Sequence, residues 1–254
     1  MVNVGQGLCE VLEWDTTFFG FRVARVCGDA LTQEQVQEID DWCGQNRVRC
    51  LYFLSRADDA DTTRLAEDHG FRLVDIRMTF ERWASGTVEI TKEQPDADVV
   101  VRHALQEDVA LLQRVARDSY HDTRFHFDTN FPRHLDELLY ETWIKVSCEG
   151  YADAVLVAIL DGVPVGYITC HIGKDPRSGR IGLVGIGAQV RGRGVGRVLV
   201  FNALDWFCSQ GVTDVLVVTQ GRNCAAQRLY QGCGFLTREV QLWYHKWYPH
   251  SAAT

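Results

Sequence analysis

The sequence predicts an α/β protein of the α+β type, with a central mixed, mostly antiparallel sheet flanked by helices and a smaller N-terminal α/β domain before it. Two observations support this prediction. Short apolar runs of strand length alternate with stretches of helical spacing. A polar stretch at 84–97, broken by glycine and proline, separates the two parts. We therefore expect domains at 1–84 and 99–254, joined by a linker at 85–98.

The N-terminal part shows helix and strand signals in alternation. Thr32 with Gln35 three residues later is typical of a helix N-terminus, and Gly70 is typical of a helix end. The expected elements are an aromatic packing segment (12–21), a helix (32–44), a buried strand (51–54), a helix (62–69) and a long strand (71–83).

The C-terminal part has more strands. Asp161-Gly162 between two apolar runs predicts a hairpin. The expected elements are a strand (99–104), a helix (107–117), a polar–aromatic loop (119–128), a helix (135–146), the hairpin strands (154–160 and 163–172), a strand (181–187), a helix from about 194, a buried strand (215–218), a helix (223–230) and the last strands (238–248).

The totals limit the classes of partner. The 254 residues, 46% hydrophobic and 11% aromatic, suffice for one large or two small domains with a sizeable core. The net charge of −8 argues against nucleic acid or an anionic membrane as the main partner. No apolar run approaches the roughly 18 residues of a membrane span, and the N-terminus lacks the features of a signal peptide. We expect a cytoplasmic protein.

The nine cysteines form an odd set without a C-x-x-C pair, and most lie inside apolar runs. Free cysteine packs as a small hydrophobe, and a metal site requires paired ligand spacing. We interpret the cysteines as reduced thiols and predict no metal site.

The N-terminal part repeats the C-terminal part. A shift of 164 positions aligns about thirty residues without a gap, so that Trp42 falls on Trp206 and Phe71 on Phe235. We interpret both as one helix–strand–helix–strand unit used twice. A glycine-rich loop of the C-terminal copy aligns with 25–32, where Gly28 is the only glycine. The N-terminal copy should therefore lack the chemistry of that loop.

That glycine-rich loop follows the apolar run at 181–187 and opens a helix near Gly194. It reads Gln189-Val190-Arg191-Gly192-Arg193-Gly194-Val195-Gly196. Its glycines let the backbone approach a ligand closely, and the first N–H groups of a helix carry partial positive charge without an internal partner. Arginines in the loop and first turn add charge, so the stretch predicts an anion site. Its spacing fits neither a P-loop nor a dinucleotide fingerprint.

Two motifs in this order resemble the GNAT family of acyl-CoA-dependent N-acetyltransferases. Q/R-x-x-G-x-G/A matches Gln189 to Gly194, and N-x-x-A-x-x-L-Y-x-x-x-G-F matches Asn223 to Phe235. The resemblance implies a GNAT fold, a partial GNAT-like unit before it, and acetyl-CoA as co-substrate. The strand end at 186–189 departs from the family, since it lacks the proline that many members carry. The implied acetyl-CoA residues are Val184, Ile186, Arg191, Gly192, Arg193, Gly194, Val195, Gly196, Asn223 and Ala226.

Direct acetyl transfer needs a polarised carbonyl, a proton for the departing thiolate, and a neutral amine. Members of the family separate the strand before the loop from the next strand, and the acetyl-pantetheine lies in the gap. Tyr230 is the candidate general acid, because a phenol with a pKa near ~10 stays protonated at neutral pH. For the base the sequence is weak: His171, His121 and His126 are candidates, and many relatives use ordered water.

Three stretches resemble the group of dTDP-fucosamine (nucleotide-amino-sugar) acetyltransferases within the family: Trp14–Phe21, Thr123–Phe125 and Arg180–Tyr230. The implied acceptor is the primary amine of a nucleotide-linked aminodeoxy sugar. The polar–aromatic loop has a composition typical of binding loops. The candidate acceptor-binding residues are Arg124, Phe125 and His171.

Two alternatives stay open. The acceptor could be another small amine or amino acid, or the chain could be a non-catalytic acyl-CoA-binding regulatory module. The intact Tyr230, Asn223 and glycine-rich loop favour an enzyme. We also expect the N-terminal unit to pack on the acceptor side or to make a homodimer contact, and we expect no nucleic-acid or membrane partner.

Overall fold

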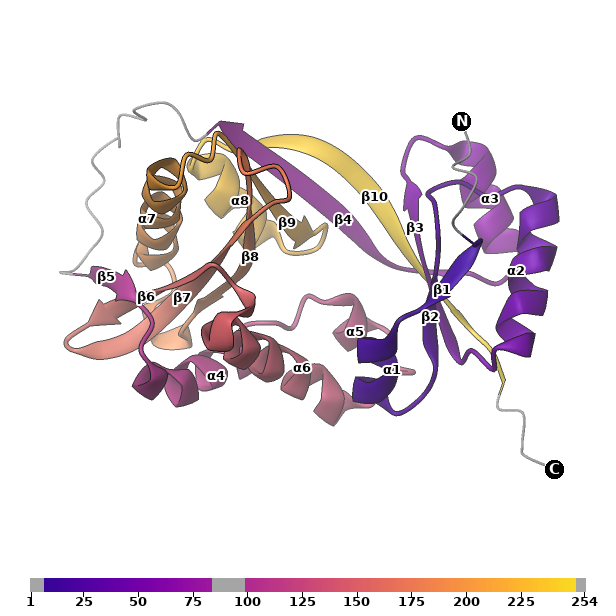
Figure 1. Cartoon of the computed structure of the whole chain (residues 1–254), viewed down its shortest axis with the longest axis horizontal. Coiled ribbons are helices and arrows are strands. Elements are labelled where there is room, and N and C mark those ends of the chain that lie inside the picture. Colours follow the sequence, from indigo (N-terminus) through magenta and orange to yellow (C-terminus); the bar gives the residue numbers. More distant parts are fainter. Residues whose placement is uncertain (1–6, 84–98, 250–254) are drawn as a thin grey trace. The chain divides into compact units, whose positions relative to one another are not determined.

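A computed structural model describes residues 7–83 and 99–249 (Figure 1). The fold is mixed α/β, with sheet strands and flanking helices as predicted. The described residues form two compact units. The first unit comprises residues up to Arg77, 124–131 and those from Val240 on, and the second comprises 78–123 and 132–239. The domain ranges 1–84 and 99–254 stay a prediction, and the expected linker at 85–98 lies outside the described residues.

The strands of the first unit follow the order β1-β2-β3-β10-β4, and only the end of β10 and the start of β4 belong to it. β1–β2 and β3–β10 are antiparallel, whereas β2–β3 is parallel. Its elements are β1 (Cys9–Val11), α1 (Glu13–Phe19), β2 (Val23–Val26), α2 (Gln33–Gln45), β3 (Cys50–Arg56), α3 (Ala60–Asp68), the start of β4 (Arg72–Trp83), α5 (Arg124–Phe127) and the end of β10 (Leu236–Trp247).

Local signals explain the helices of the first unit. Thr32 and Gln35 form the expected capping box at the start of α2. α3 begins two residues before the expected position, because the Asp59 side chain accepts from the Thr62 N–H at 3.0 Å. The segment at 12–21 contains a helix, α1, which ends at Gly20 in the left-handed conformation (φ 74°).

The second unit continues the strand order as β4-β9-β8-β7-β6-β5. The pairs from β5 to β8 are antiparallel and β8–β9 is parallel. Its elements are the end of β4, β5 (Val100–His103), η1 (Gln106–Asp108), α4 (Val109–Arg117), α6 (Arg133–Val146), η2 (Ser147–Tyr151), β6 (Ala154–Leu160), β7 (Val163–Ile172), β8 (Ser178–Ile186), η3 (Ala188–Val190), α7 (Val195–Ser209), β9 (Asp214–Gln220), α8 (Cys224–Gly232) and the start of β10.

The two faces of β7 have different neighbours. Ile168 and Cys170 belong to the apolar core with Leu199 of α7. Tyr167 faces the other way, because successive side chains of a strand alternate, and its hydroxyl lies 3.3 Å from that of Tyr120, which follows α4. The second unit is therefore covered by α7 on one face of its sheet and by α4 on the other (Figure 1).

The repeat predicted from the sequence is confirmed at the level of elements. Shifting β3, α3 and β4 by 164 positions gives the bounds of β9, α8 and β10. The final strands are exchanged: residues 241–247 of β10 pair with β3 in the first unit, whereas β4 lies next to β9 in the strand order. Each copy is thus completed by a strand from the other.

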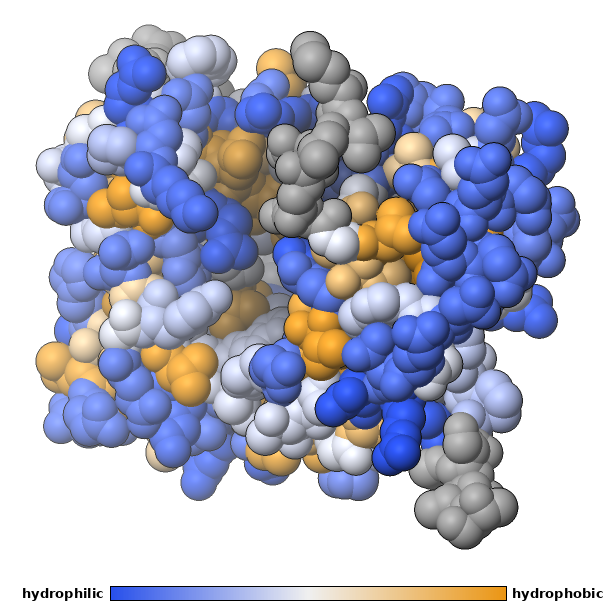
Figure 2. Space-filling view, turned by 45° about the vertical axis from the view of Figure 1, so that its right-hand side comes forward, coloured by the Kyte–Doolittle hydropathy of each residue, from blue (hydrophilic) through white to orange (hydrophobic). Residues whose placement is uncertain are grey.

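Hydrophilic residues dominate the face drawn in Figure 2, and apolar residues form small separate groups there. The cysteines are all free, and those at 9, 43, 50, 170 and 233 are buried. Within 7–83 and 99–249, no helix combines the length and apolar character needed to cross a bilayer. Over the same ranges, no group of three or more His, Cys, Asp or Glu side chains is placed to hold a metal ion.

Candidate active site

β8 and β9 separate halfway along their length. Their parallel pairing ends where Ile181 lies opposite Val217, although β8 continues to Ile186 and β9 to Gln220. The unpaired halves leave a gap at the carboxyl ends of the two strands. This is the separation that the family resemblance implied.

Backbone groups of β8 point toward this gap. The Gly187 N–H donates to the Val165 carbonyl at 2.8 Å, on the β7 side. Because hydrogen-bonded and non-bonded pairs alternate in antiparallel strands, the N–H groups of Val184 and Ile186 point away from β7. They therefore face the side from which β9 has separated, where they can donate to a ligand.

Two glycines of β8 let ring side chains of β7 lie directly against the β8 backbone. A Cβ atom on Gly185 would lie 2.5 Å from the Tyr167 ring, and one on Gly182 would lie 2.6 Å from Nε2 of His171. Neither position has room for a side chain. Packing against β7 therefore requires glycine at positions 182 and 185. A backbone without side chains there would also let a ligand come close.

The glycine-rich loop enters α7 with two left-handed residues, Gly192 (φ 77°) and Gly194 (φ 79°), which only glycine adopts without strain. Gly194 precedes the first helical residue, Val195. The first N–H groups of a helix, which here starts at Val195, have no acceptor one turn earlier within the helix. They form the positive end of a 15-residue helix.

The Arg191 side chain anchors this loop. Its Nε donates to the Ile186 carbonyl at 3.1 Å and its Nη2 to the Asp118 carbonyl at 2.6 Å. The sequence placed Arg191 among the cofactor residues. That role stays a prediction; in the structure the Arg191 guanidinium fixes the loop against the end of β8.

Helix α8 begins at the other predicted motif. The Asn223 Oδ1 accepts from the Ala226 N–H at 3.0 Å, which is a helix cap. Gln227 donates to the carbonyls of Gln220 and Gly221 at the end of β9, at 3.1 and 2.8 Å. These bonds hold α8 against the separated half of β9.

Tyr230 lies on α8, packed against Phe80 and Phe235 with ring centroids 6.2 and 5.9 Å away. The side chain is buried, and burial raises the pKa of its phenol. Its hydroxyl makes no hydrogen bond to another described residue. Tyr230 is therefore protonated at neutral pH, and its O–H is available to a ligand.

Sequence reasoning missed a cluster of buried tyrosines beside β8. Tyr167 and Tyr120 share a hydrogen bond, and Tyr120 stacks on Tyr140 with centroids 4.0 Å apart. Burial raises the pKa of both Tyr120 and Tyr167. In the sequence, the only hint is the glycine that precedes Tyr167 on the same strand; that Gly185 of β8 lies opposite Tyr167 is known only from the strand register.

His171, expected on the acceptor side, lies in the second unit near the start of the strand separation. Its Nε2 is 3.3 Å from the Thr169 hydroxyl, which also accepts from the Leu183 N–H at 2.8 Å. Burial and the nearby Arg180 charge lower the pKa of His171. The imidazole is therefore neutral at physiological pH.

Arg124 and Phe125, the other acceptor candidates, begin α5 in the first unit. The guanidinium carbon of Arg124 lies 4.0 Å from the Trp243 ring centroid, 4.4 Å from that of Tyr52 and 4.5 Å from that of Phe125. The structure thus joins these two candidates with strand residues far away in the sequence. We call Arg124 with these three rings the arginine cage.

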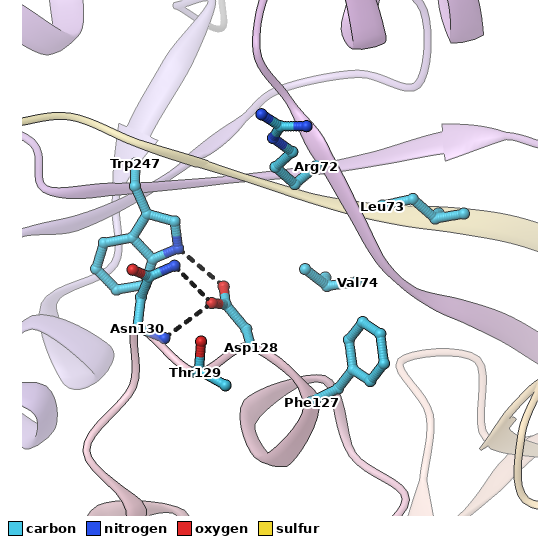
Figure 3. Close-up of a pocket in the computed structure, with 8 residues that line it drawn as sticks. All are labelled: Arg72, Leu73, Val74, Phe127, Asp128, Thr129, Asn130 and Trp247. Carbon is cyan, nitrogen blue, oxygen red and sulfur yellow. Dashed lines mark hydrogen bonds between the residues drawn. The ribbon is translucent and has the colours of Figure 1, made fainter.

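A pocket of about 180 Å³ also lies in the first unit (Figure 3). Asp128 at its wall accepts hydrogen bonds from Nε1 of Trp247 at 2.8 Å and from the Asn130 backbone and amide at 3.1 and 2.8 Å. The residues that line the pocket are Arg72, Leu73, Val74, Phe127, Asp128, Thr129, Asn130 and Trp247.

Asp128 also binds a buried histidine, since Nδ1 of His245 lies 2.7 Å from its Oδ2. Burial raises the pKa of Asp128, but the hydrogen bonds from His245 and Trp247 outweigh it and bring the pKa to about 2. Burial lowers the pKa of His245 to about 4. His245 is therefore neutral, with its proton on Nδ1 and a lone pair on Nε2 that has no partner.

The residues at the strand separation and the α7 start fit a bound acyl-CoA. The helix start and left-handed glycines suit a pyrophosphate, and the gap between β8 and β9 exposes backbone donors for an extended pantetheine arm. Tyr230 belongs to the helix that follows β9. All of these groups lie within the second unit.

Comparison with known proteins agrees with this geometry. Residues 115–235 match the family described as Acetyltransferase (GNAT) family. The chain is 25% identical over 246 residues to dTDP-fucosamine acetyltransferase of Escherichia coli, which covers 93% of this chain and 97% of that protein. It is 25% identical to the spore coat polysaccharide biosynthesis protein SpsD of Bacillus subtilis, over 55% of this chain and 48% of that protein.

Solved structures show the same fold. A GCN5-related N-acetyltransferase from Sphaerobacter thermophilus has a TM-score of 0.67 at 19% identity, covering 94% of this chain and 76% of the other. A GCN5-related N-acetyltransferase from Kribbella flavida has a TM-score of 0.66 at 16% identity, covering 98% and 90%. Both matches extend over both units.

Proposed function

We propose that this chain, which carries a GNAT acetyltransferase domain and is an acyl-CoA-dependent N-acetyltransferase, acetylates the primary amine of a nucleotide-linked (dTDP) aminodeoxy sugar. The proposal rests on one relative that is similar to this chain over nearly its whole length. The dTDP-fucosamine acetyltransferase aligns over 93% of the chain. A mycothiol acetyltransferase of Rhodococcus erythropolis is more similar, at 36%, but over only 28% of the chain.

In the proposed reaction, three groups of the second unit act on the thioester and its products. The N–H groups of Val184 and Ile186 stabilise negative charge on the acetyl oxygen as the amine attacks. The Tyr230 O–H donates its proton to the departing sulfur. Burial supports this role, because it keeps the phenol protonated until charge develops on the sulfur.

The attacking amine must lose a proton before or during the attack. His171 is neutral at physiological pH, which supports a role as acceptor of that proton, directly or through water. Ordered water without a dedicated base is the alternative. Replacing His171 by glutamine separates the two: an unchanged pH–rate profile would leave the role to water.

An acceptor screen tests the proposed substrate. Release of the CoA thiol is measured with acetyl-CoA and, in turn, dTDP-linked amino sugars, UDP-linked amino sugars and free amino acids. We expect the largest kcat/KM with a dTDP-linked amino sugar and a product acetylated on nitrogen. Preference for an amino acid would replace this acceptor, and acetyl-CoA binding without turnover on any amine would favour a regulatory module.

A further inference from the structure

The guanidinium of Arg124 carries a charge that no carboxylate of the described residues pairs within 4.0 Å, although Asp15 is near enough to interact with it. It makes no hydrogen bond or ion pair with another described residue, and its Nη1 is fully buried. Buried charges in proteins are normally paired, because removing an ion from water is costly. The cage rings attract the cation through their faces, but they cannot accept its N–H groups.

The neighbouring carboxyl group does not fill this role. Burial raises the pKa of Asp15, and the Arg124 charge only partly opposes that effect. Among the described residues, no ion pair within 4.0 Å joins Asp15 to Arg124, although their charges interact. The Arg124 guanidinium therefore has a buried N–H donor without an acceptor.

Two more polar atoms beside the cage are also buried, the Tyr52 hydroxyl and Nε2 of His245. The hydroxyl has the Asp15 carboxyl as its neighbour, outside ordinary hydrogen-bond geometry, and Nε2 has no partner. The rings of these residues lie 4.8 Å apart, and Arg124 stacks on Tyr52. Both side chains are fully buried, at 1% and 0% exposure. Three unsatisfied polar atoms in one cluster are unusual for a native core.

The chemistry of these atoms defines a ligand. Arg124 and Tyr52 offer donors, which suit a phosphate, and a guanidinium fork matches phosphate oxygens in two-pronged fashion. Neutral His245 offers one acceptor, which suits an O–H or N–H of the same ligand. A bare carboxylate or phosphate would leave His245 unused. A nucleotide supplies both kinds of group.

From these contacts we infer that the arginine cage of the first unit is a nucleotide-phosphate site, in which Arg124 binds a nucleoside diphosphate with Tyr52 and His245 beside it. The inference rests on the proposed function for the identity of the nucleotide. The binding itself is a property of the first unit, and the ligand would displace rotamers that now close the site.

Calorimetry with dTDP as the probe tests the site, in the presence of saturating CoA so that the CoA pyrophosphate site of the second unit is filled. We expect Arg124→Met to weaken dTDP binding roughly 10–100-fold, the range of a charged hydrogen bond. Arg25→Met is the matched control, because Arg25 lies in the same unit and pairs with Glu10 on the surface. It should leave dTDP affinity unchanged.

Stability without nucleotide separates a binding role from a packing role. An unsatisfied buried cation opposes folding, so the melting temperature of Arg124→Met should equal or exceed that of the parent. A lower melting temperature with unchanged dTDP affinity would mean that Arg124 only packs, and it would overturn the inference. If Arg124→Met does not fold, Arg124→Lys keeps the charge, and its dTDP affinity must still fall because the planar fork is lost.

Arg72→Met tests the pocket of Figure 3 as a rival location. Loss of dTDP binding in that variant, with Arg124→Met unaffected, would overturn the inference. Failure of the inference and of the proposed function can be told apart. Arg124-dependent dTDP binding without acetylation of any dTDP-amino sugar retains the site and rejects the proposed acceptor. If Arg124→Met acetylates a dTDP-amino sugar with an unchanged KM for that sugar, the proposed acceptor is retained and the site at Arg124 is rejected.

Discussion

The two helix–strand–helix–strand copies share a backbone plan but differ at the point where a ligand would enter. In the C-terminal copy, β8 and β9 part after Ile181, and a glycine-rich loop opens α7. In the N-terminal copy, the Arg56 N–H at the end of β3 donates to the Asp29 carbonyl at 3.4 Å. The Leu31 N–H donates to the Thr62 hydroxyl at 3.0 Å. In the N-terminal copy, these hydrogen bonds join backbone segments at the place where β8 and β9 separate in the C-terminal copy.

The two copies also differ in which element carries a large aromatic side chain. Tyr230 on α8 corresponds to Ala66 on α3, whereas Val217 on β9 corresponds to Phe53 on β3. Phe53 fills the core of the N-terminal copy, against Phe71 at 5.7 Å. Phe53 and Tyr230 are side chains of similar volume, but of the two only Tyr230 carries a hydroxyl. Equal folding therefore does not require equal chemistry.

Replacing Gly194 by tryptophan should have the largest effect on this comparison. Gly194 has φ 79°, where other residues are strained, and an indole there would occupy the space in front of the α7 N–H groups. We expect acetyl-CoA affinity by calorimetry to fall at least about 100-fold. Gly28→Trp in the N-terminal copy, also at positive φ, is the control and should leave the affinity unchanged.

The titration of the parent chain should give one acetyl-CoA per chain, since only the C-terminal copy has the open loop. Two molecules per chain would contradict the functional difference between the copies.

Tyr230→Phe should lower kcat by about 10²–10⁴-fold, the usual range for general acid catalysis. The ring stays, so packing should change little and KM for acetyl-CoA should move little. Steady-state rates with chemistry shown to be rate-limiting provide the measurement. The loss should be smaller with donors whose thiol leaves more readily, and a folded variant with near-normal kcat would reduce Tyr230 to a packing residue.

Acid should destabilise the first unit through His245. The folded chain binds this proton only below about pH 4, whereas an unfolded histidine binds it below about pH 6.5. Between these values the unfolded state binds more protons, so stability falls as the pH falls, by on the order of 1–3 kcal/mol. Asp128, with a pKa of about 2, extends the loss below pH 4. Denaturant unfolding of His245→Gln should show a flatter dependence between pH 6.5 and 4.

Tyr244→Phe should have the smallest effect. Tyr244 lies on the part of β10 that belongs to the first unit and corresponds to Phe80 on β4, and its hydroxyl is buried without a hydrogen bond of ordinary geometry. Removing it should leave kcat unchanged and change the free energy of unfolding by less than about 1 kcal/mol, toward higher stability. A large loss of activity would show that the first unit takes part in the chemistry through this group.

The elements, and those parts of the site whose residues are neighbours in the chain, can be predicted from local sequence patterns. Apolar periodicity, the Thr32 cap and the Asp161-Gly162 turn predicted helices and strands, because these signals act within a few residues. The glycine-rich loop and the helix with Tyr230 were readable for the same reason. The repeat was readable because two stretches with the same pattern form the same elements.

Which distant residues meet depends on how the whole chain packs. Nothing local in the sequence brings Arg124 to Tyr52 and Trp243, or Asp128 to His245, because each pair is joined by packing and not by spacing. The exchange of β4 and β10 between the copies has the same origin, since many pairings satisfy one strand pattern. Long-range contacts are chosen by the total burial and hydrogen bonding of the folded chain, and that sum exists only once the whole chain has folded.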